Sequence, residues 1–180
     1  MTAESAPASQ PSPSWREKDG VIYFSVVSEG TTSEDWIIWF ESNDFQVSGY
    51  AKEVLRSPDF KPTSGVVTEV AVLKGMLFEA NDRATKTIRA EADKRKLSKP
   101  NPELACLIRE KFTNDEMFAM GLLDIIVMHE PIKGVNGDPL LLSVMRYNFG
   151  RWLDACGGRP GDGWGPGSGF AFAVSQHQAY

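Results

Sequence analysis

Residues 150–174 read GRWLDACGGRPGDGWGPGSGFAFAV, and this stretch decides the C-terminal half of the fold. Eight of the chain's 16 glycines lie between positions 150 and 169. Glycine weakens helices and strands because it loses the most backbone entropy on folding. We therefore expect a long loop over residues 150–169 rather than a regular helix or a long strand. Phe170–Val174 (FAFAV) follows as a final strand, which we expect to be central and buried on both faces.

The residues before this stretch predict a β-hairpin. Ile125–His129 is strand-like, and Leu140–Met145 is a second apolar strand. The sequence VNGD at 135–138 between them carries an Asn-Gly turn signal. The predicted glycine-rich loop is therefore anchored between two strands rather than being a free tail.

The N-terminal part predicts alternating strands and helices. Val21–Val27 and Val66–Leu73 are rich in β-branched residues and are expected to be strands, the second ending at Gly75. A short helix is expected over Ser48–Arg56, ended by Ser57-Pro58, and a loop over residues 57–65.

Capping signals predict four further helices. Thr31 and Glu34 form a capping box ahead of an apolar stripe, and Thr113 and Glu116 form another in a helix that Gly121 stops. Asp82 is expected to cap a helix to about Lys96, and Asn101-Pro102 to open one with proline at its first position. Their expected buried residues are Trp36, Ile37, Trp39 and Phe40 in the first helix, Ala84, Ile88 and Ala92 in the Asp82 helix, and Leu104, Leu107, Ile108 and Phe112 in the Asn101-Pro102 helix.

Length and composition indicate one globular domain. The 180 residues are 42% hydrophobic and 24% charged, with a net charge of −5, which argues against a broad nucleic-acid or anionic-membrane footprint. We expect residues 1–14 to be a disordered Ala/Ser/Pro tail and residues 15–180 a single binding domain. We find neither a signal peptide nor a membrane-spanning run, and expect the chain to be cytoplasmic as synthesised. A disulfide between Cys106 and Cys156 is possible, although nothing in the sequence supports it.

Residues 147–169 contain two kinds of side chain and include no Lys, Glu, Gln or Met. Arg151, Trp152, Leu153 and Trp164 are bulky and are expected to form a scaffold under the loop. The others are small, polar or aromatic, and are our candidate ligand-binding residues: Tyr147, Asn148, Phe149, Asp154, Cys156, Gly157, Gly158, Asp162, Gly163, Gly165, Gly167 and Ser168.

The pattern GRWL…W…GFAF resembles the variable region of target proteins of diversity-generating retroelements. In that family an error-prone reverse transcriptase randomises adenines, chiefly in Asn codons. Such codons can yield every residue type in the candidate set, but not Lys, Glu, Gln, Met or Trp. The resemblance implies an α+β domain with a C-type-lectin-like (formylglycine-generating-enzyme-like) fold, in which a helical N-terminal half supports an antiparallel sheet and the long loop. It also implies that the first and last strands pair, placing Val21–Val27 beside Phe170–Val174.

The function that the sequence favours is non-catalytic recognition of a protein ligand by the 147–169 surface, without a cofactor, metal or nucleic acid. In the first alternative the chain is a structural or assembly protein whose loop is a connector. It would dock through the basic face of a helix, formed by Lys86, Arg89, Lys94, Arg95, Lys96 and Lys99. The same pattern is also typical of a helix face that is simply exposed to solvent. A more remote alternative is a hydrolase using His129 and Glu130. A calcium site is not expected, because Asp138, Asp154 and Asp162 match no calcium-loop spacing.

Overall fold

The longest strand pairing joins β2 (Val21–Glu29) to β4 (Ser64–Lys74), where β-branched side chains alternate between the two sheet faces. The computed structural model describes residues 14–148 and 150–174. The predicted tail, apart from Ser14, and the candidate residue Phe149 lie outside these residues. The expected strands Val21–Val27 and Val66–Leu73 are confirmed, each slightly longer than expected. A short strand not foreseen from the sequence, β1 (Arg16–Lys18), precedes β2.

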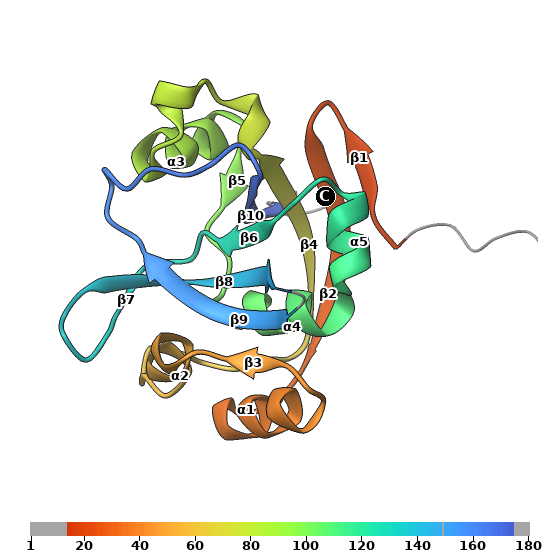
Figure 1. Ribbon diagram of the computed structural model, residues 1–180, viewed down its shortest axis with the longest axis vertical. Helices are drawn as coiled ribbons and strands as arrows, with labels where there is room; N and C mark the ends of the chain where they lie inside the picture. The colour runs from red at the N-terminus through yellow and green to blue at the C-terminus, as the bar shows by residue number, and fades with distance from the viewer. Residues whose placement is uncertain (1–13, 149, 175–180) are drawn as a thin grey trace, which may run out of the picture.

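In the described part of the chain, ten strands form one mixed sheet (Figure 1). Its main path runs β1-β2-β4-β10-β6-β8-β9-β3, with β5 on β10 and β7 on β8. The β10–β6 and β3–β9 pairs are parallel, so the sheet is not purely antiparallel. The remaining strands are β3 (Gln46–Val47), β5 (Leu97–Ser98), β6 (Asp124–Val127), β7 (Ile132–Lys133), β8 (Pro139–Tyr147), β9 (Gly150–Gly157) and β10 (Ser168–Val174).

Helices pack on both faces of this mixed sheet (Figure 1), and the helices and largely antiparallel strands together are consistent with the expected α+β class. They are α1 (Ser33–Ser42), α2 (Gly49–Leu55), α3 (Thr85–Lys94), α4 (Leu104–Lys111) and α5 (Asn114–Ala119), with short 3₁₀ turns η1 (Gly75–Leu77) and η2 (Ala80–Asp82). We call the face under α1, α2, α4 and α5 the inner face; its buried residues form the larger core cluster. The opposite, outer face has a smaller cluster under α3. None of the helices in residues 14–148 and 150–174 has the length and apolar run that a membrane crossing needs.

The helix starts show which capping predictions were correct. Thr113 and Glu116 form the expected capping box, and Gly121 ends that helix with φ +78°. The Thr31/Glu34 box is wrong by one residue, because the Thr32 hydroxyl accepts from the Asp35 amide instead.

Two other helices start later than expected. Asp82 lies in η2, and α3 begins after Ala84 without a side-chain cap. Pro102 lies in a turn before α4, not at its first helical position. The expected core residues Ile88, Ala92, Leu104 and Phe112 are nevertheless buried. Two other expected core residues are not, because Trp39 of α1 is 38% exposed and Ala84 is half-buried.

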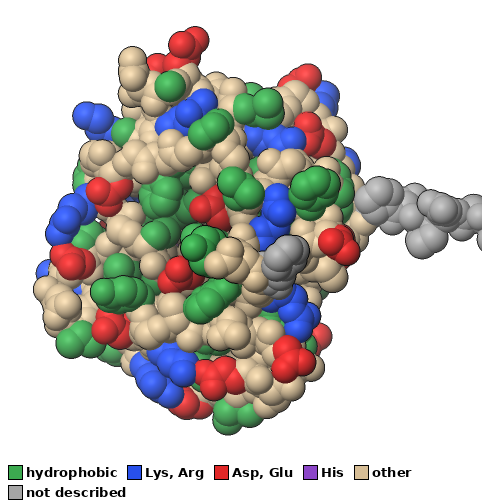
Figure 2. Space-filling view, viewed as in Figure 1, with side chains coloured by type: hydrophobic (Ala, Val, Ile, Leu, Met, Phe, Trp, Pro, Cys, Tyr) green, Lys and Arg blue, Asp and Glu red, His purple; other side chains and the backbone are tan. Residues whose placement is uncertain are grey.

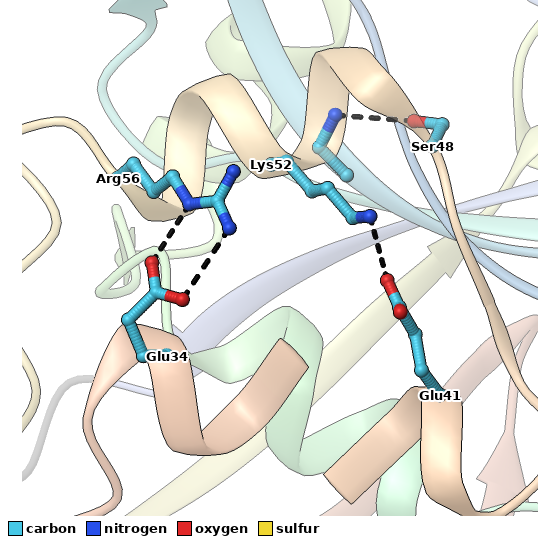
Figure 3. A network of polar contacts seen from close by, with 6 residues as sticks. Glu34, Glu41, Ser48, Lys52 and Arg56 are labelled. Atoms are coloured by element: carbon cyan, nitrogen blue, oxygen red, sulfur yellow. Dashed lines mark hydrogen bonds and ion pairs between the residues drawn. The ribbon is translucent and has the colours of Figure 1, made fainter. Parts of the chain in front are cut away.

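Helices α1 and α2 are joined across their exposed sides by two ion pairs (Figure 3). Arg56 pairs with Glu34, and Lys52 with Glu41. The Ser48 hydroxyl caps α2 by accepting from the Ala51 amide at 3.1 Å, which confirms the helix expected over Ser48–Arg56. Exposed ion pairs contribute little free energy, so the buried aromatic cluster beneath α1 holds this layer in place.

Two expectations about the C-terminal third are wrong. Residues 150–157 form the eight-residue strand β9, paired along its length with β8, so the glycine-rich loop begins only after Gly157. In addition, Phe170–Val174 does not lie beside Val21–Val27, because β4 pairs with both β2 and β10 and separates them. Strand β10 is nevertheless interior and buried on both faces, as expected: Ala171 belongs to one core cluster, and Phe170 and Phe172 to the other.

Candidate functional site

Strand β9 presents alternate side chains to opposite faces of the sheet. Leu153 and Ala155 are buried in the inner core cluster. Trp152, Asp154 and Cys156 therefore point to the outer face, because successive side chains in a strand alternate. All three are half-buried. Leu153 is buried, as expected for a scaffold residue. Trp152 was expected to lie beneath the binding surface, but it forms part of the outer face itself.

The register continues this face across three neighbouring strands. Ser143 of β8 lies directly opposite Asp154, and Met145 lies opposite Trp152. Asp124 of β6 pairs with Met145, and on its other side with Ser168 of β10. Asp124, Ser143, Asp154 and Ser168 thus form a group of polar residues on four adjacent strands, which we call the outer-face polar cluster.

One atom of this cluster, Asp124 Oδ1, is buried without a hydrogen-bond partner in the described part of the chain. Burial raises the pKa of the Asp124 carboxyl, and a hydrogen bond from Ser168 opposes that effect. One Asp154 carboxylate oxygen accepts from the Ala155 amide at 2.8 Å. Burial raises the pKa of the Cys156 thiol to about 12, against the opposing effect of a hydrogen bond with Ser143.

Exposed side chains lie beside the cluster. Tyr147, at the end of β8, is 62% exposed on the outer face, and Leu123, which precedes Asp124, is 57% exposed. Phe118 of α5 is 67% exposed, but its ring lies 5.1 Å from the guanidinium of Arg146, whose side chain belongs to the inner face of β8. Figure 2 shows hydrophobic and acidic side chains next to one another over β8 and β9 on this side of the molecule. Apolar contact area and polar specificity are therefore available on one surface.

The glycine-rich loop, residues 158–167, is fastened to the start of α3. The Thr85 amide donates to Asp162 O at 3.0 Å, and the Trp164 amide donates to Arg83 O at 2.8 Å. Trp164 Nε1 also donates to Thr85 Oγ1 at 3.0 Å, and its ring packs edge-on against Phe170. Trp164 therefore acts as scaffold, as expected, although it is half-buried rather than fully buried.

The structure brings together only part of the candidate set. Asp154, Cys156 and Ser168 lie on the outer face, and Tyr147 and Asn148 are exposed beside it. The rest of the set belongs to the loop and the end of β9: Gly157, Gly158, Asp162, Gly163, Gly165 and Gly167. Gly158 and Ser168 are buried, which limits what either could contact.

Several loop positions leave little room for other side chains. A Cβ at Gly157 would lie 2.8 Å from the Asp162 carboxylate, and one at Gly167 would lie 2.9 Å from Leu123. Asp162 itself accepts from the Arg159 amide at 2.9 Å and so stabilises the turn. Gly163 and Gly165 have space around them: an added Cβ at Gly163 would lie 3.9 Å from Arg83 O, and one at Gly165 would have no such atom within 4 Å.

Asp124, Ser143 and Met145 were missed because their place depends on strand register. Two signals were nevertheless present in the sequence. Ser143 interrupts the apolar run Leu140–Met145, and Asp124 stands directly before Ile125–Val127. A polar residue in a strand that is otherwise buried needs a partner or a function.

His129 does not support the hydrolase alternative. It is fully buried; its Nε2 accepts from the Leu142 amide at 2.9 Å, and its Nδ1 contacts Glu130 O at 2.7 Å. Both ring nitrogens are therefore committed to the backbone. The Glu130 carboxylate points away and pairs with Lys99 at the surface.

Much of the basic run around α3 is engaged within the domain. Arg89 donates to the Met128 and His129 carbonyls, Arg95 pairs with Glu91, and Lys99 pairs with Glu130. The described residues hold no group of three or more His, Cys, Asp or Glu able to bind a metal ion. Cys106 and Cys156 are both free thiols, so the possible disulfide is not formed.

A separate hollow of about 230 Å³ lies on the inner side of β8 and β9, bordered by α2 and the β7–β8 turn. Its charged groups are already paired within the domain. Glu53 accepts from the Val135 amide, and Asp138 pairs with Arg159. The outer-face polar cluster is therefore the better candidate for a site.

Comparison of the chain with protein-family models, curated proteins and solved structures finds no match.

Proposed function

We propose that this chain is a non-catalytic protein-binding domain whose ligand docks on the outer face of β8 and β9. The observation that carries the proposal is that the exposed side chains of Tyr147 and Leu123 lie beside the half-buried Trp152 and Asp154 on this face. Protein interfaces are enriched in aromatic anchors, and polar groups at their centres give specificity. The fully bonded state of His129 also favours binding over catalysis at that position.

Selection of displayed peptides tests the proposal. A random 12-residue library is selected on the full chain, and each binder is measured on two variants with matched tyrosine substitutions. Tyr147→Ala removes a side chain from the proposed face, whereas Tyr50→Ala removes one of similar exposure, 57%, from α2. We expect binders that lose at least tenfold in affinity on Tyr147→Ala and none on Tyr50→Ala. Binders indifferent to Tyr147 would place the ligand elsewhere.

The proposal includes diversification of this face by a retroelement, on a domain related to C-type lectins. The positions of Asp154 and Cys156 on the outer face support it, as does the packing of Leu153 and Trp164 within the domain. The test lies in the DNA. We expect a near-copy of the codons for residues 140–176, with adenines where the gene differs, beside a reverse-transcriptase gene. A locus that has neither the near-copy nor the reverse-transcriptase gene would exclude diversification. The binding face would still be tested by the peptide selection.

In the alternative, the chain is an assembly protein that docks through the exposed side of α3. Hydrogen bonds hold residues 158–167 against the start of α3. A loop that stabilises the fold in this way, rather than binding a ligand, favours this alternative. Charge reversal at Lys86 and Lys94, both exposed, would then abolish a native complex, whereas Tyr147→Ala would leave it intact.

A further inference from the structure

Strand β2 continues along the margin of the sheet past the end of β1 (Figure 1). Strand β1 pairs with β2 only as far as Tyr23. Because the Lys74 amide donates to Gly20 O at 3.2 Å, the backbone of Gly20 is directed towards β4. Successive residues of a strand direct their backbone groups to opposite sides, so those of Ser25 and Val27 point away from β4. In the described part of the chain these groups therefore have no strand to pair with.

The open edge of β2 borders a groove that reaches α4. Two adjoining hollows of about 360 and 330 Å³ form it, and both are lined by Ser25 and Lys111. Phe24 lines the first hollow and Leu107 the second. Val27, on the outer side of the edge, is 50% exposed. We call this feature the β2 groove. Exposed edge strands of this kind are templates for pairing with another chain.

The two ends of the β2 groove carry opposite charges. Arg16 borders one end, and Glu29 and Glu110 border the other. Burial raises the pKa of the Glu110 carboxyl, and the nearby Glu29 adds to that effect, so a cation from outside would be favourable there. Arg16 makes a long ion pair with Glu69, at 3.9 Å, between two exposed side chains. A two-fold axis would bring the acidic end of one groove to the basic end of another, because it reverses the strand direction.

We propose that the edge of β2 pairs with β2 of a second copy of this chain. A two-fold axis at Val26 sets the two strands antiparallel and places Ser25 opposite the partner's Val27. Each of these residue pairs can then exchange two backbone hydrogen bonds. The partner's Glu29 approaches the end of β1, where Arg16 stands. Backbone bonds provide the affinity of such strand addition, and the charged ends fix its direction. This surface is separate from the proposed binding face, so the two proposals are tested independently.

Sedimentation equilibrium of the full chain at several concentrations measures the pairing. Val27→Pro removes an edge N–H that makes no bond to β4, a position where a strand tolerates proline. Val27→Thr is the matched control, because it keeps that N–H and nearly the same shape. Arg16→Glu and Glu29→Arg are measured singly and together. Urea unfolding checks that each variant is folded, and amide hydrogen exchange of the wild type at Ser25 and Val27 reports whether the edge is covered.

We expect a wild-type dimer whose dissociation constant rises roughly tenfold or more in Val27→Pro and is unchanged in Val27→Thr. Each single charge reversal should weaken the dimer, and the two together should restore it. The Ser25 and Val27 amides should exchange more slowly as the concentration rises.

A chain that stays monomeric would overturn the proposal. Slow exchange of the edge amides in that monomer would assign the edge to another segment of the same chain, and fast exchange would leave it open to an extended segment of a different protein. A dimer that tolerates Val27→Pro, or that the double charge reversal does not restore, would also overturn the proposal, because it would use another surface.

Discussion

Protonation of His129 should destabilise the fold in mild acid. The Leu142 backbone N–H can only donate, so Nε2 must accept from it and the ring proton must lie on Nδ1, where it donates to Glu130 O. The geometry therefore requires the neutral ring. Burial, helped by the nearby Arg89 charge, lowers the pKa of His129 from 6.5 to about 4.

The size of the effect follows from that pKa. Between about pH 4 and 6.5 the unfolded chain binds a proton at this position and the folded chain does not. The free energy of unfolding therefore rises with pH through this window. It has the full contribution of His129 above pH 6.5 and loses it as the pH falls towards 4. A shift from 6.5 to about 4 is worth roughly 3 kcal/mol, since one pKa unit corresponds to about 1.4 kcal/mol.

The assay is urea unfolding between pH 4 and 7.5. The wild type is compared with His129→Gln, whose amide does not titrate in this range and can still offer an acceptor to Leu142. Both carry His177→Gln, so that His129 is the one imidazole of the reference protein and its variant has none. We expect the wild type to lose roughly 3 kcal/mol more than His129→Gln over this range. Parallel pH profiles, or an imidazole NMR signal that titrates near 6.5, would refute the reasoning and reopen His129 as a proton-transfer group.

Three further predictions concern the outer face and its loop. Asp124→Asn should raise the urea midpoint at pH 7, and it should remove a fall in stability above pH 4, because the buried carboxyl has a raised pKa. Gly75→Ala should cost roughly 1–3 kcal/mol in the same assay, since its Cβ would lie 2.6 Å from Gly165 O, whereas Gly49→Ala, with open space around it, should cost almost nothing. The Cys156 thiol should react with a disulfide reagent at pH 8 only after unfolding, because its pKa is about 12, and rapid reaction of the native protein would contradict this.

Local signals in the sequence gave the elements that depend on local physics. The capping box of Thr113 and Glu116 and the turn containing Gly137, with φ +83°, were predicted from a few adjacent residues. Strand β10 was predicted from alternating bulky and small residues, and its burial on both faces was confirmed. In each case the deciding interactions lie within the segment itself or depend on its periodicity.

Strand β9 was wrongly predicted as a loop because the number of glycines was considered and their positions were not. Eight glycines in twenty residues suggested a loop, but the first two in β9, Gly150 and Gly157, stand at its ends. The six residues between them alternate between the core and the outer face like any half-buried strand. The wrong pairing of β2 with β10 has a different cause, because β4 separates them and only long-range contacts reveal that order.

Only part of the candidate site could be predicted from the sequence. Asp154 and Cys156 were found because they stand in a distinctive segment, whereas Asp124 and Ser143 stand in ordinary apolar strands. What unites the cluster is the register of four strands, two of which are joined in parallel. A parallel pairing between residues 124–127 and 168–171 has no local turn to signal it.

The composition of the glycine-rich loop suggested a binding surface, but its contacts indicate a structural role. Its backbone is bonded to Arg83 and Thr85, and Trp164 fixes it against Phe170. A loop held at so many points contributes the wall of the outer face rather than an adaptable contact surface. Glycine serves this purpose because it allows close approach, as where Gly75 lies against the carbonyls of Gly165, Pro166 and Ser168. If the proposed binding face is correct, ligand choice depends on the side chains of β8 and β9, where a substitution changes the surface without breaking the hydrogen bonds of the loop.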